Sequence, residues 1–384
     1  MPTRAAQLFS RPLDLGGLTI PNRIVMAPMT RFDSPDGVPS DDLAAYYARR
    51  AANGVGLVIT ESVYVDHPSA GQLDNGSRMY GDAALAGWSR AVRAVHAEGG
   101  LVFAQLQHIG MVRKAGDPPH PEAPAVGPSG VPMDGAVDPS GLPVDDNPRR
   151  GRAMTQDDID DVVRAFAEGA ATAARLGFDG VELHGAHGYL IDQFFWSRSN
   201  RRTDAYGGGT GSRARFAAEV VAEVVAAVRG AVPAGFPVVV RLSQWKSNDF
   251  DARSFDTPED LGVVLDKLAD AGADAFHAST RRYWQPAFAG SDLNLAGWTK
   301  KLSGKPAITV GSVGLDNDFW NSLTGEAVAT TGIDGLLDRL ESDEFDLVAI
   351  GRPLIADPEW AAKMLTGRKN EITAFTAAAL GSVH

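Results

Sequence analysis

Short apolar runs rich in β-branched residues recur along the chain, and they constrain its fold more than any other feature. Eight such runs are separated by Ala-rich amphipathic segments, and each run is continuously apolar rather than alternating. This pattern is typical of strands buried on both faces of a parallel sheet. The runs begin at Ile24, Gly56, Leu101, Gly180, Val238, Ala275, Ala307 and Leu347. Eight strand-then-helix units in order predict an α/β fold of the closed (β/α)8 TIM barrel type, with an open doubly wound sheet as its rival.

The segments between the runs carry signals for helix starts and stops. In the clearest of them, Thr155 can cap a helix, acidic residues crowd the first turn, and Gly177 follows the last arginine. The stretch TPED from Thr257 is a second capped start. Helices therefore alternate with the predicted strands, as a barrel requires.

Length and composition favour one domain with a single long interruption. The chain has 384 residues, of which 44% are hydrophobic, so it can bury a large core as one domain or two. No low-complexity linker divides it, and we expect one barrel over residues 1–384. The Pro- and Gly-rich stretch 110–154 falls between the third strand and its helix. A loop of this length is usually functional, and we expect it to form a lid-like insertion.

Charge and the absence of cysteine exclude several classes of chemistry and partner. With no Cys, the chain has no disulfides, thiolate zinc sites, iron–sulfur clusters or cysteine nucleophile. A net charge of −12 argues against nucleic-acid and membrane-surface partners. There is no signal-peptide pattern and no apolar stretch near the ~20 residues that a bilayer requires. We expect a soluble, cytoplasmic protein, monomeric or homo-oligomeric, that acts on small molecules.

Polar residues at the ends of the apolar runs are the first site candidates, because a (β/α)8 barrel forms its active site at the carboxyl ends of its strands. The first run closes with Pro28, Met29 and Thr30, the third with Gln105 and the fourth with His184, and Arg241 lies within the fifth. A buried arginine needs an anion or several acceptors. Arg241 can pair with Glu182 or contact a ligand, and we favour the ligand.

The last two runs end in glycine-containing segments, GSVG from Gly311 and GRP from Gly351. The loops after strands seven and eight of such barrels often bind phosphate through backbone N–H groups. Glycines permit close backbone approach, and Arg352 supplies a planar fork of donors. The matched positions favour a phosphate site over plain turn glycines.

The fourth run leads into HGAHGYL, which brings His184, His187 and Tyr189 together. Two histidines at this spacing could bind a metal, but zinc needs a third protein ligand, and we expect no metal. The histidines could instead be satisfied in a loop network. The sharper hypothesis is two imidazole N–H donors converging on one carbonyl oxygen, with the phenol, whose ordinary pKa is about 10, as a proton donor.

Four motifs together resemble the old yellow enzyme family of FMN-dependent ene-reductases, and they span nearly the whole chain. They are PNRIVMAPMTR (21–31), HGAHGYLIDQFFWSRSNRRTDAYGG (184–208), GSVG (311–314) and AIGRPLIADPEW (349–360). The resemblance implies a barrel in which NADH or NADPH reduces FMN. The flavin then passes hydride to the β-carbon of an α,β-unsaturated carbonyl compound. The missing cysteine excludes the branch with an iron–sulfur cluster and the branch with cysteine at the position of Thr30.

The resemblance also assigns roles to the candidate residues. His184 and His187 match the pair that binds the substrate carbonyl, and Tyr189 matches the tyrosine that protonates the α-carbon. The implied flavin contacts are Thr30 at a flavin carbonyl, Gln105 at the pyrimidine edge, Arg241 beside N1 and O2, Pro28 and Met29 at the ring edge, and Ser62 after the second strand. The implied phosphate contacts are Gly311, Ser312, Gly351 and Arg352.

The loop after the sixth run, STRRYWQPAFAGSD, is aromatic and basic. Tyr283 and Trp284 either wall the substrate pocket or pack within a long loop. Other functions also remain open. They are a cofactor-free isomerase or aldolase acting on a phosphorylated substrate, a nitro or quinone reductase on the same flavin scaffold, and a non-catalytic flavin carrier.

Overall fold

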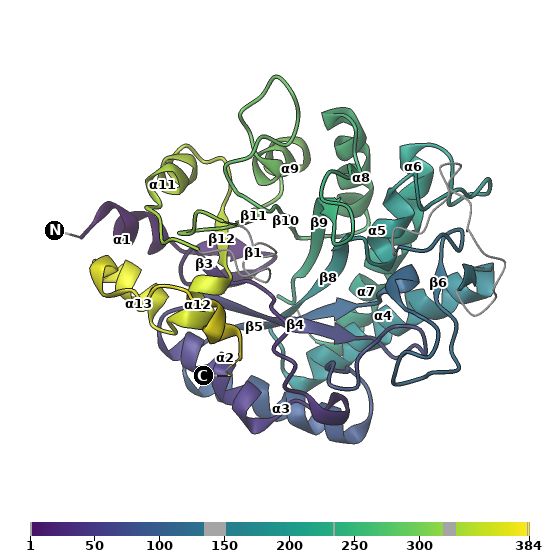
Figure 1. Ribbon diagram of the computed structural model, residues 1–384, viewed down its shortest axis with the longest axis horizontal. Helices are drawn as coiled ribbons and strands as arrows, with labels where there is room; N and C mark the ends of the chain where they lie inside the picture. The colour runs from purple at the N-terminus through teal and green to yellow at the C-terminus, as the bar shows by residue number, and fades with distance from the viewer. Residues whose placement is uncertain (1, 134–150, 233–234, 318–327, 382, 384) are drawn as a thin grey trace.

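All eight apolar runs form strands, and these close into one parallel barrel (Figure 1). The structure is a computed structural model that describes residues 2–133, 151–232, 235–317, 328–381 and 383. The barrel strands are β3 (Ile24–Met26), β4 (Leu57–Tyr64), β5 (Val102–Gln107), β8 (Gly180–His187), β9 (Val238–Lys246), β10 (Ala275–Ser279), β11 (Ala307–Val310) and β12 (Leu347–Ile350). Their order around the barrel follows the chain, and β12 closes it on β3, with Val348 opposite Ile24. The predicted (β/α)8 barrel is confirmed, and the rival open sheet is wrong.

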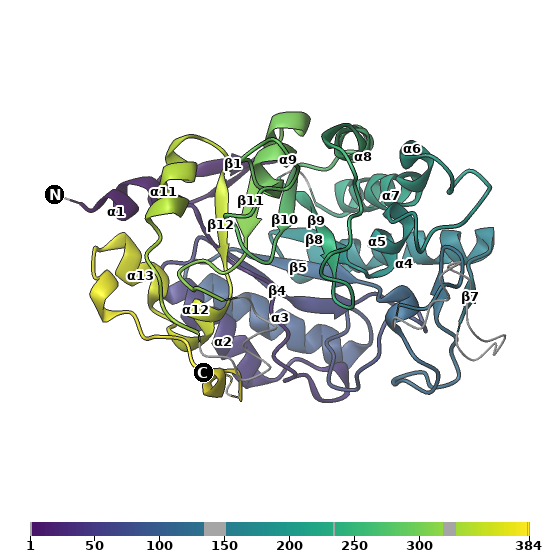
Figure 2. The same cartoon turned by 45° about the horizontal axis from the view of Figure 1, so that its top comes forward.

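Helices follow the strands and lie around the barrel in both views (Figures 1 and 2). They are α2 (Asp41–Ala52), α3 (Asp82–Ala97), α4 (Gln156–Leu176), α7 (Arg215–Ala231), α8 (Pro258–Asp270), α9 (Leu295–Ser303), α11 (Asp334–Glu341), α12 (Arg352–Ala356) and α13 (Trp360–Leu365). Shorter elements are α1 (Arg4–Phe9), β1 (Leu13–Leu15), β2 (Leu18–Ile20), α5 (Leu190–Phe195) and α6 (Thr210–Arg213). No helix in the described part of the chain is long and apolar enough to cross a bilayer.

The predicted helix caps are present. At the start of α4 the Thr155 hydroxyl accepts the N–H of Asp158, and the Asp158 carboxylate accepts the N–H of Thr155. The same helix ends at Gly177 with a left-handed φ of 91°. Thr257 caps α8 by accepting the N–H of Asp260. These caps satisfy N–H groups that a helix end leaves without partners.

Alternate residues of each strand pack in opposite directions, which explains the continuously apolar runs. On β3, Ile24 and Met26 face the surrounding helices, whereas Val25 and Ala27 belong to the cluster inside the barrel. The β1–β2 hairpin adds Leu15 and Ile20 to that inner cluster and closes the amino end of the barrel. The barrel strand β3 is therefore buried on both faces.

One step toward the carboxyl ends, the inward-facing positions become polar. Phe103, Val239 and Ala275 belong to the inner apolar cluster. Two residues further along the same strands are Gln105, Arg241 and His277, and Glu182 joins them from β8. The barrel thus carries a polar layer directly beneath its mouth.

The stretch predicted as an insertion leaves the barrel after β5 and returns at α4. Its described parts contain the 3-10 turn Gly110–Val112 and two short paired strands, β6 (Val126–Gly127) and β7 (Arg152–Ala153). Residues 134–150 of the predicted insertion lie outside the described residues. The buried guanidinium of Arg113 donates to the backbone carbonyls of Gly71, Asp117, Pro118, His120 and Ala123. One side chain therefore holds the start of the insertion, whose role as a lid stays a prediction.

Candidate active site

His184, His187 and Tyr189 converge at the carboxyl end of β8. Their ring centroids lie 4.9 Å apart for the two histidines, 4.8 Å for His184 and Tyr189, and 6.5 Å for His187 and Tyr189. His184 points inward from the strand, and the chain turns after His187 so that Tyr189 stands at the residue before α5. The structure thus brings together the three side chains that the sequence predicted.

Burial keeps all three groups neutral. It lowers the pKa of both His184 and His187 well below the ordinary histidine value, and the nearby Arg241 guanidinium lowers it further. Burial also raises the pKa of the Tyr189 phenol. The Nδ1 atom of His184 accepts the N–H of Ala186 at 3.4 Å, a contact that fits the tautomer with its ring proton on Nε2. The site therefore offers uncharged hydrogen-bond donors at neutral pH.

Two further residues fix the imidazole of His187. Its Nε2 lies 2.7 Å from the Ser279 hydroxyl at the end of β10. Its ring packs on Trp245 at a centroid distance of 4.4 Å, and the Trp245 indole N–H donates to the Ser279 carbonyl. Neither residue is among those predicted from the sequence. Ser279 carried a usable signal, because it is a polar residue at the end of an apolar run.

The polar layer beneath these side chains is hydrogen-bonded around Glu182. The Gln105 amide donates to Glu182 Oε1 at 2.7 Å, and His277 Nδ1 lies 2.6 Å from Oε2. Burial alone would raise the pKa of Glu182, but His277 and Arg241 lower it below its ordinary value. The carboxylate is therefore an ionised centre to which both Gln105 and His277 are attached.

Arg241 retains capacity to bind a ligand. Its Nη2 donates to the Ser279 hydroxyl at 3.4 Å, and its charge acts on Glu182. Its Nε is buried and has no hydrogen-bond partner among the described residues. Buried donors are nearly always satisfied, so this atom fits an acceptor-rich or anionic ligand above the polar layer.

The predicted phosphate residues also lie together, at the ends of β11 and β12. Arg352 opens α12, is almost fully buried, and donates to the Ser312 hydroxyl at 3.2 Å. Ser312 has a left-handed φ of 47°. A Cβ on Gly311 would lie 2.6 Å from the Thr280 carbonyl oxygen, so that position requires glycine. This strained turn beside a buried cation suits an anionic group.

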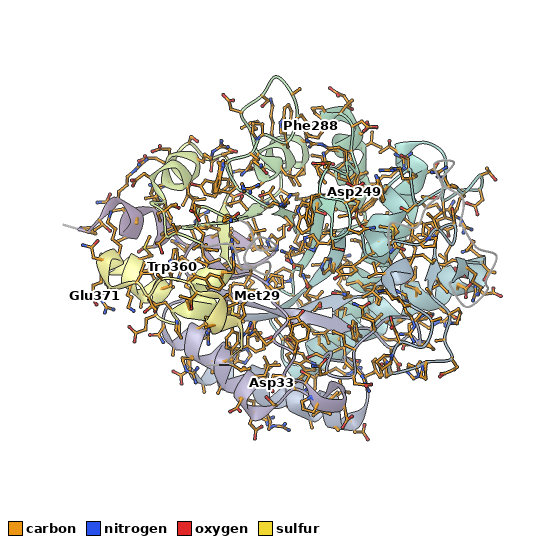
Figure 3. The ribbon with its side chains drawn as sticks, in the orientation of Figure 1. Met29, Asp33, Asp249, Phe288, Trp360 and Glu371 are labelled. Carbon is orange, nitrogen blue, oxygen red and sulfur yellow. The ribbon has the colours of Figure 1, made fainter. Side chains whose placement is uncertain are left out.

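The segment after β3 lies beside the loop after β12, because these two strands are neighbours in the barrel. Pro28, Met29 and Thr30 are each half-buried, and Figure 3 shows Met29 near the centre of the view, beside α12. A Cβ on Gly351 would lie 3.5 Å from the Met29 sulfur, so the first and last strand ends meet there. The next N–H, of Arg31, donates to the buried carboxylate of Glu61 at 2.7 Å.

Ser62 stands opposite Gln105 in the β4–β5 ladder. This pairing follows a register shift between Ile59 and Ser62 in β4. The shift lets the ladder resume with Ser62 level with the polar layer. Ser62 and Gln105, the flavin contacts predicted at the second and third strands, are thus neighbours.

Comparison with known proteins identifies the chain's relatives. Residues 7–371 match the NADH:flavin oxidoreductase / NADH oxidase family. The chain belongs to this family. FMN is therefore its cofactor, with NADH or NADPH as the hydride donor.

Two relatives of this flavin oxidoreductase differ in how much of their own length the chain covers. It is 34% identical to the NADH oxidase of Thermoanaerobacter brockii over 96% of this chain and 52% of that protein, so it spans about half the length of this relative. It is 31% identical to the NADPH dehydrogenase of Bacillus licheniformis over 94% of this chain and 95% of that protein.

Solved structures of the family share the fold. A structure of morphinone reductase in complex with tetrahydroNAD matches with a TM-score of 0.76 and 28% identity, over 98% of this chain and 97% of that one. The old yellow enzyme homologue from Zymomonas mobilis has the same fold, with a TM-score of 0.76 and 24% identity over 97% and 96% of the two chains. The resemblance to the old yellow enzymes is confirmed.

Tyr283 and Trp284 lie in the loop that follows β10. Tyr283 is buried in the core, with its hydroxyl toward α11, and Trp284 packs edge-on against it at 5.0 Å while remaining 38% exposed. Their place in the substrate pocket stays a prediction. Within the described residues, no three His, Asp or Glu side chains are grouped as a metal site.

Proposed function

We propose that this flavin oxidoreductase reduces the activated C=C bond of α,β-unsaturated carbonyl compounds. One observation carries the proposal, namely that two neutral imidazoles and one neutral phenol meet at the barrel mouth with ring centroids 4.8 to 6.5 Å apart. Two donors on one oxygen polarise a carbonyl, and a phenol beside them can protonate carbon. Reduced FMN, when bound, supplies the hydride.

His184 and His187 bind the substrate carbonyl oxygen in this proposal. With Nδ1 accepting a backbone N–H, His184 presents its Nε2 proton. Ser279 and Trp245 hold the ring of His187, so its donor is preorganised. Hydrogen bonds to the carbonyl draw electron density from the conjugated alkene, which makes its β-carbon more electrophilic. The low histidine pKa values keep both imidazoles uncharged, so neither ring attracts anions as an imidazolium would.

Tyr189 donates the proton to the α-carbon. Burial raises the pKa of its phenol, so the proton is present throughout the physiological range. Arg241 opposes that effect and would stabilise the phenolate that remains after donation. Tyr189 thus carries its proton before the transfer, and Arg241 would partly offset the negative charge of the phenolate after it.

The residues present fit FMN. The unsatisfied Nε of Arg241 and the Gln105 side chain line the polar layer that would face the pyrimidine edge of the flavin. Thr30 follows β3 and Ser62 lies within the neighbouring strand β4, while Pro28 and Met29 would lie at the ring edge. At the other end, Arg352 and the Ser312 turn would hold the phosphate, together with the backbone at Gly311 and Gly351.

The test separates the two half-reactions by stopped flow. Tyr189→Phe should leave reduction of the flavin by NADH or NADPH within about twofold and slow its reoxidation by an enone about 100-fold or more. Tyr206→Phe is a matched control, because that phenol binds Glu219 and Gln156 away from the barrel mouth. Equal losses in both half-reactions of Tyr189→Phe would contradict the assigned role.

Other functions predict different observations on the purified protein. Protein that stays colourless when FMN is added, yet acts on a phosphorylated sugar, would favour a cofactor-free isomerase or aldolase. Yellow protein that does not consume NAD(P)H with an enone would be a flavin carrier. A steady-state panel of enones, nitro compounds and quinones distinguishes an ene-reductase from a nitro or quinone reductase on the same scaffold.

A further inference from the structure

A fully buried ion pair lies directly behind the turn that carries His187 and Tyr189. Lys246, the last residue of β9, and Asp192, on α5, are both 0% exposed, and the ammonium lies 2.8 and 2.9 Å from the two carboxylate oxygens. The ammonium also donates to the Gln244 carbonyl at 2.9 Å and to the Ser254 hydroxyl at 2.5 Å. Burying a charge pair this deeply costs desolvation free energy, and hydrophobic residues of similar size often give equal or greater stability.

The carboxylate of this pair reaches the backbone between the two site residues. Asp192 Oδ2 accepts the N–H of Gly188 at 2.7 Å, and Oδ1 accepts the Ser254 hydroxyl at 2.8 Å. Gly188 is the only residue between His187 and Tyr189 in the chain. The ion pair is therefore one hydrogen bond away from the peptide that sets the separation of the two side chains.

That peptide has an uncommon conformation. His187 has a left-handed φ of 66° and Gly188 one of 83°. A histidine with positive φ is held only where its surroundings fix it, and such strain is concentrated at functional sites. A straight continuation of β8 would instead carry His187 and Tyr189 onward along the strand.

Every backbone polar group of this turn has a partner. The N–H of His187 donates to the Ser243 hydroxyl, and its carbonyl accepts both the N–H and the hydroxyl of Ser247. The Gly188 carbonyl accepts the Gln193 amide at 2.7 Å. Of these contacts, only the bond from Gly188 to Asp192 uses an ionised group, and hydrogen bonds to ionised acceptors are the stronger ones.

We propose that Lys246 is a positioning residue for the active site, because it keeps Asp192 ionised and Asp192 in turn holds the His187–Gly188 turn in its left-handed conformation. Without the ammonium, the buried carboxyl takes up a proton and becomes a weaker acceptor. The turn then relaxes toward the strand, and the donors of His187 and Tyr189 move apart. The effect on substrate binding rests on the proposed function, whereas the effect on the turn does not.

The experiment compares Lys246→Met with the double variant Lys246→Met/Asp192→Asn. The single variant leaves an uncompensated acid, whereas the double variant restores an uncharged amide oxygen for the Gly188 N–H. With FMN-loaded protein, titration of the charge-transfer band with 4-hydroxybenzaldehyde reports how well the two histidines bind a phenolate oxygen. The single variant should raise the dissociation constant about 10- to 100-fold, and the double variant should restore it to within about threefold of wild type.

Lys363→Met is the matched control. Lys363 forms another mostly buried pair, with Asp357, on α13 and the segment before it. The Lys363→Met substitution should lower the unfolding temperature and leave the dissociation constant of the phenol unchanged. A folded, FMN-bound Lys246→Met protein that binds the phenol within twofold of wild type would overturn the proposal.

Hydrogen exchange at the Gly188 amide provides a second readout that needs neither flavin nor substrate. The exchange should be about tenfold faster in Lys246→Met and near the wild-type rate in the double variant. If the wild type binds no phenol, the proposed function fails, and this measurement alone decides the positioning role. If Lys246→Met does not fold, Ser254→Ala is the alternative, because it removes one contact from Lys246 and one from Asp192. It should weaken phenol binding and speed exchange at the Gly188 amide, both by less than Lys246→Met. Unchanged exchange in Ser254→Ala would contradict the proposal.

Discussion

At the scale of single residues, the site depends on side chains that stay uncharged although a buried arginine and glutamate lie beside them. His184 and His187 are neutral because burial disfavours the imidazolium and Arg241 repels it. An imidazolium pair would bind anions more strongly than neutral carbonyls. Neutral donors therefore suit a substrate that acquires negative charge only during the reaction.

Histidine titration checks this directly. In 15N-histidine-labelled protein without flavin, the ring resonances of His184 and His187 should not move between pH 8 and pH 5.5, whereas histidines of the denatured protein titrate near 6.5. Because folding lowers the pKa values of both histidines, the unfolded chain binds more protons than the folded one below about pH 6.5. The free energy of unfolding should therefore fall as the pH drops below that value. A midpoint near 6.5 for either ring in the folded protein would contradict the assignment.

The residues that the sequence revealed are those that stand in a local pattern. His184, His187 and Tyr189 share one short motif, and Arg241 is conspicuous inside an apolar run. Lys246 and Asp192 are 54 residues apart, and neither breaks the pattern of its segment, so their pairing has no local signal. Trp245 likewise becomes recognisable only when β8 and β9 are placed side by side.

At the scale of elements, α4 joins the barrel to the insertion through its first turn. Arg152 of β7 forms a salt bridge with Asp158, the same carboxylate that completes the capping box with Thr155. The hydrogen bond from Arg152 holds the pKa of Asp158 well below its ordinary value. One carboxylate thus serves both a helix end and the last strand of the insertion.

Replacing that carboxylate should cost stability in a pH-dependent way. Asp158→Asn should lower the unfolding free energy by about 1 kcal/mol at pH 7. Because the folded pKa is lowered, the contribution is complete above the unfolded value of about 4 and is lost as the pH falls below it. Denaturant titrations should therefore show that the difference in unfolding free energy between wild type and variant shrinks between about pH 4 and pH 2.

Asp161→Asn on the same helix is the control, since Asp161 and its partner Arg164 are both more than half exposed. It should change stability little at any pH. A constant gap for Asp158→Asn from pH 7 to pH 2 would mean that the ionised form contributes nothing.

Elements were predictable where they were long or strongly apolar. All eight strand runs and the capped starts at Thr155 and Thr257 have direct counterparts in the structure. The two-residue strands β6 and β7 and the short helix α5 have no counterpart in the prediction. Elements of so few residues span fewer than two hydrophobic periods, too few to show a repeat, so tertiary contacts define them.

At the scale of the whole molecule, FMN should stabilise the barrel by binding strand ends that are far apart in sequence. At 100 times its dissociation constant, FMN should add about 2.7 kcal/mol to the unfolding free energy. Arg352→Gln should raise the FMN dissociation constant about 10- to 100-fold, because a charged donor to phosphate is lost.

Riboflavin, which lacks the phosphate, tests whether Arg352 acts at the predicted place. Its affinity, measured by flavin fluorescence quenching, should change less than about threefold in Arg352→Gln. Circular dichroism shows whether the variant is folded. An equal loss of affinity for FMN and riboflavin would place Arg352 away from the phosphate.

The closure of β12 on β3 has a consequence for biosynthesis. Residues 24–26 leave the ribosome early, but their partners at 348–350 are among the last parts of the barrel to be made. Until then, β3 has β4 on one side and an open hydrogen-bonding edge on the other. We expect the nascent chain to depend on chaperone protection of that edge throughout most of translation, because an unpaired strand is prone to associate with other chains.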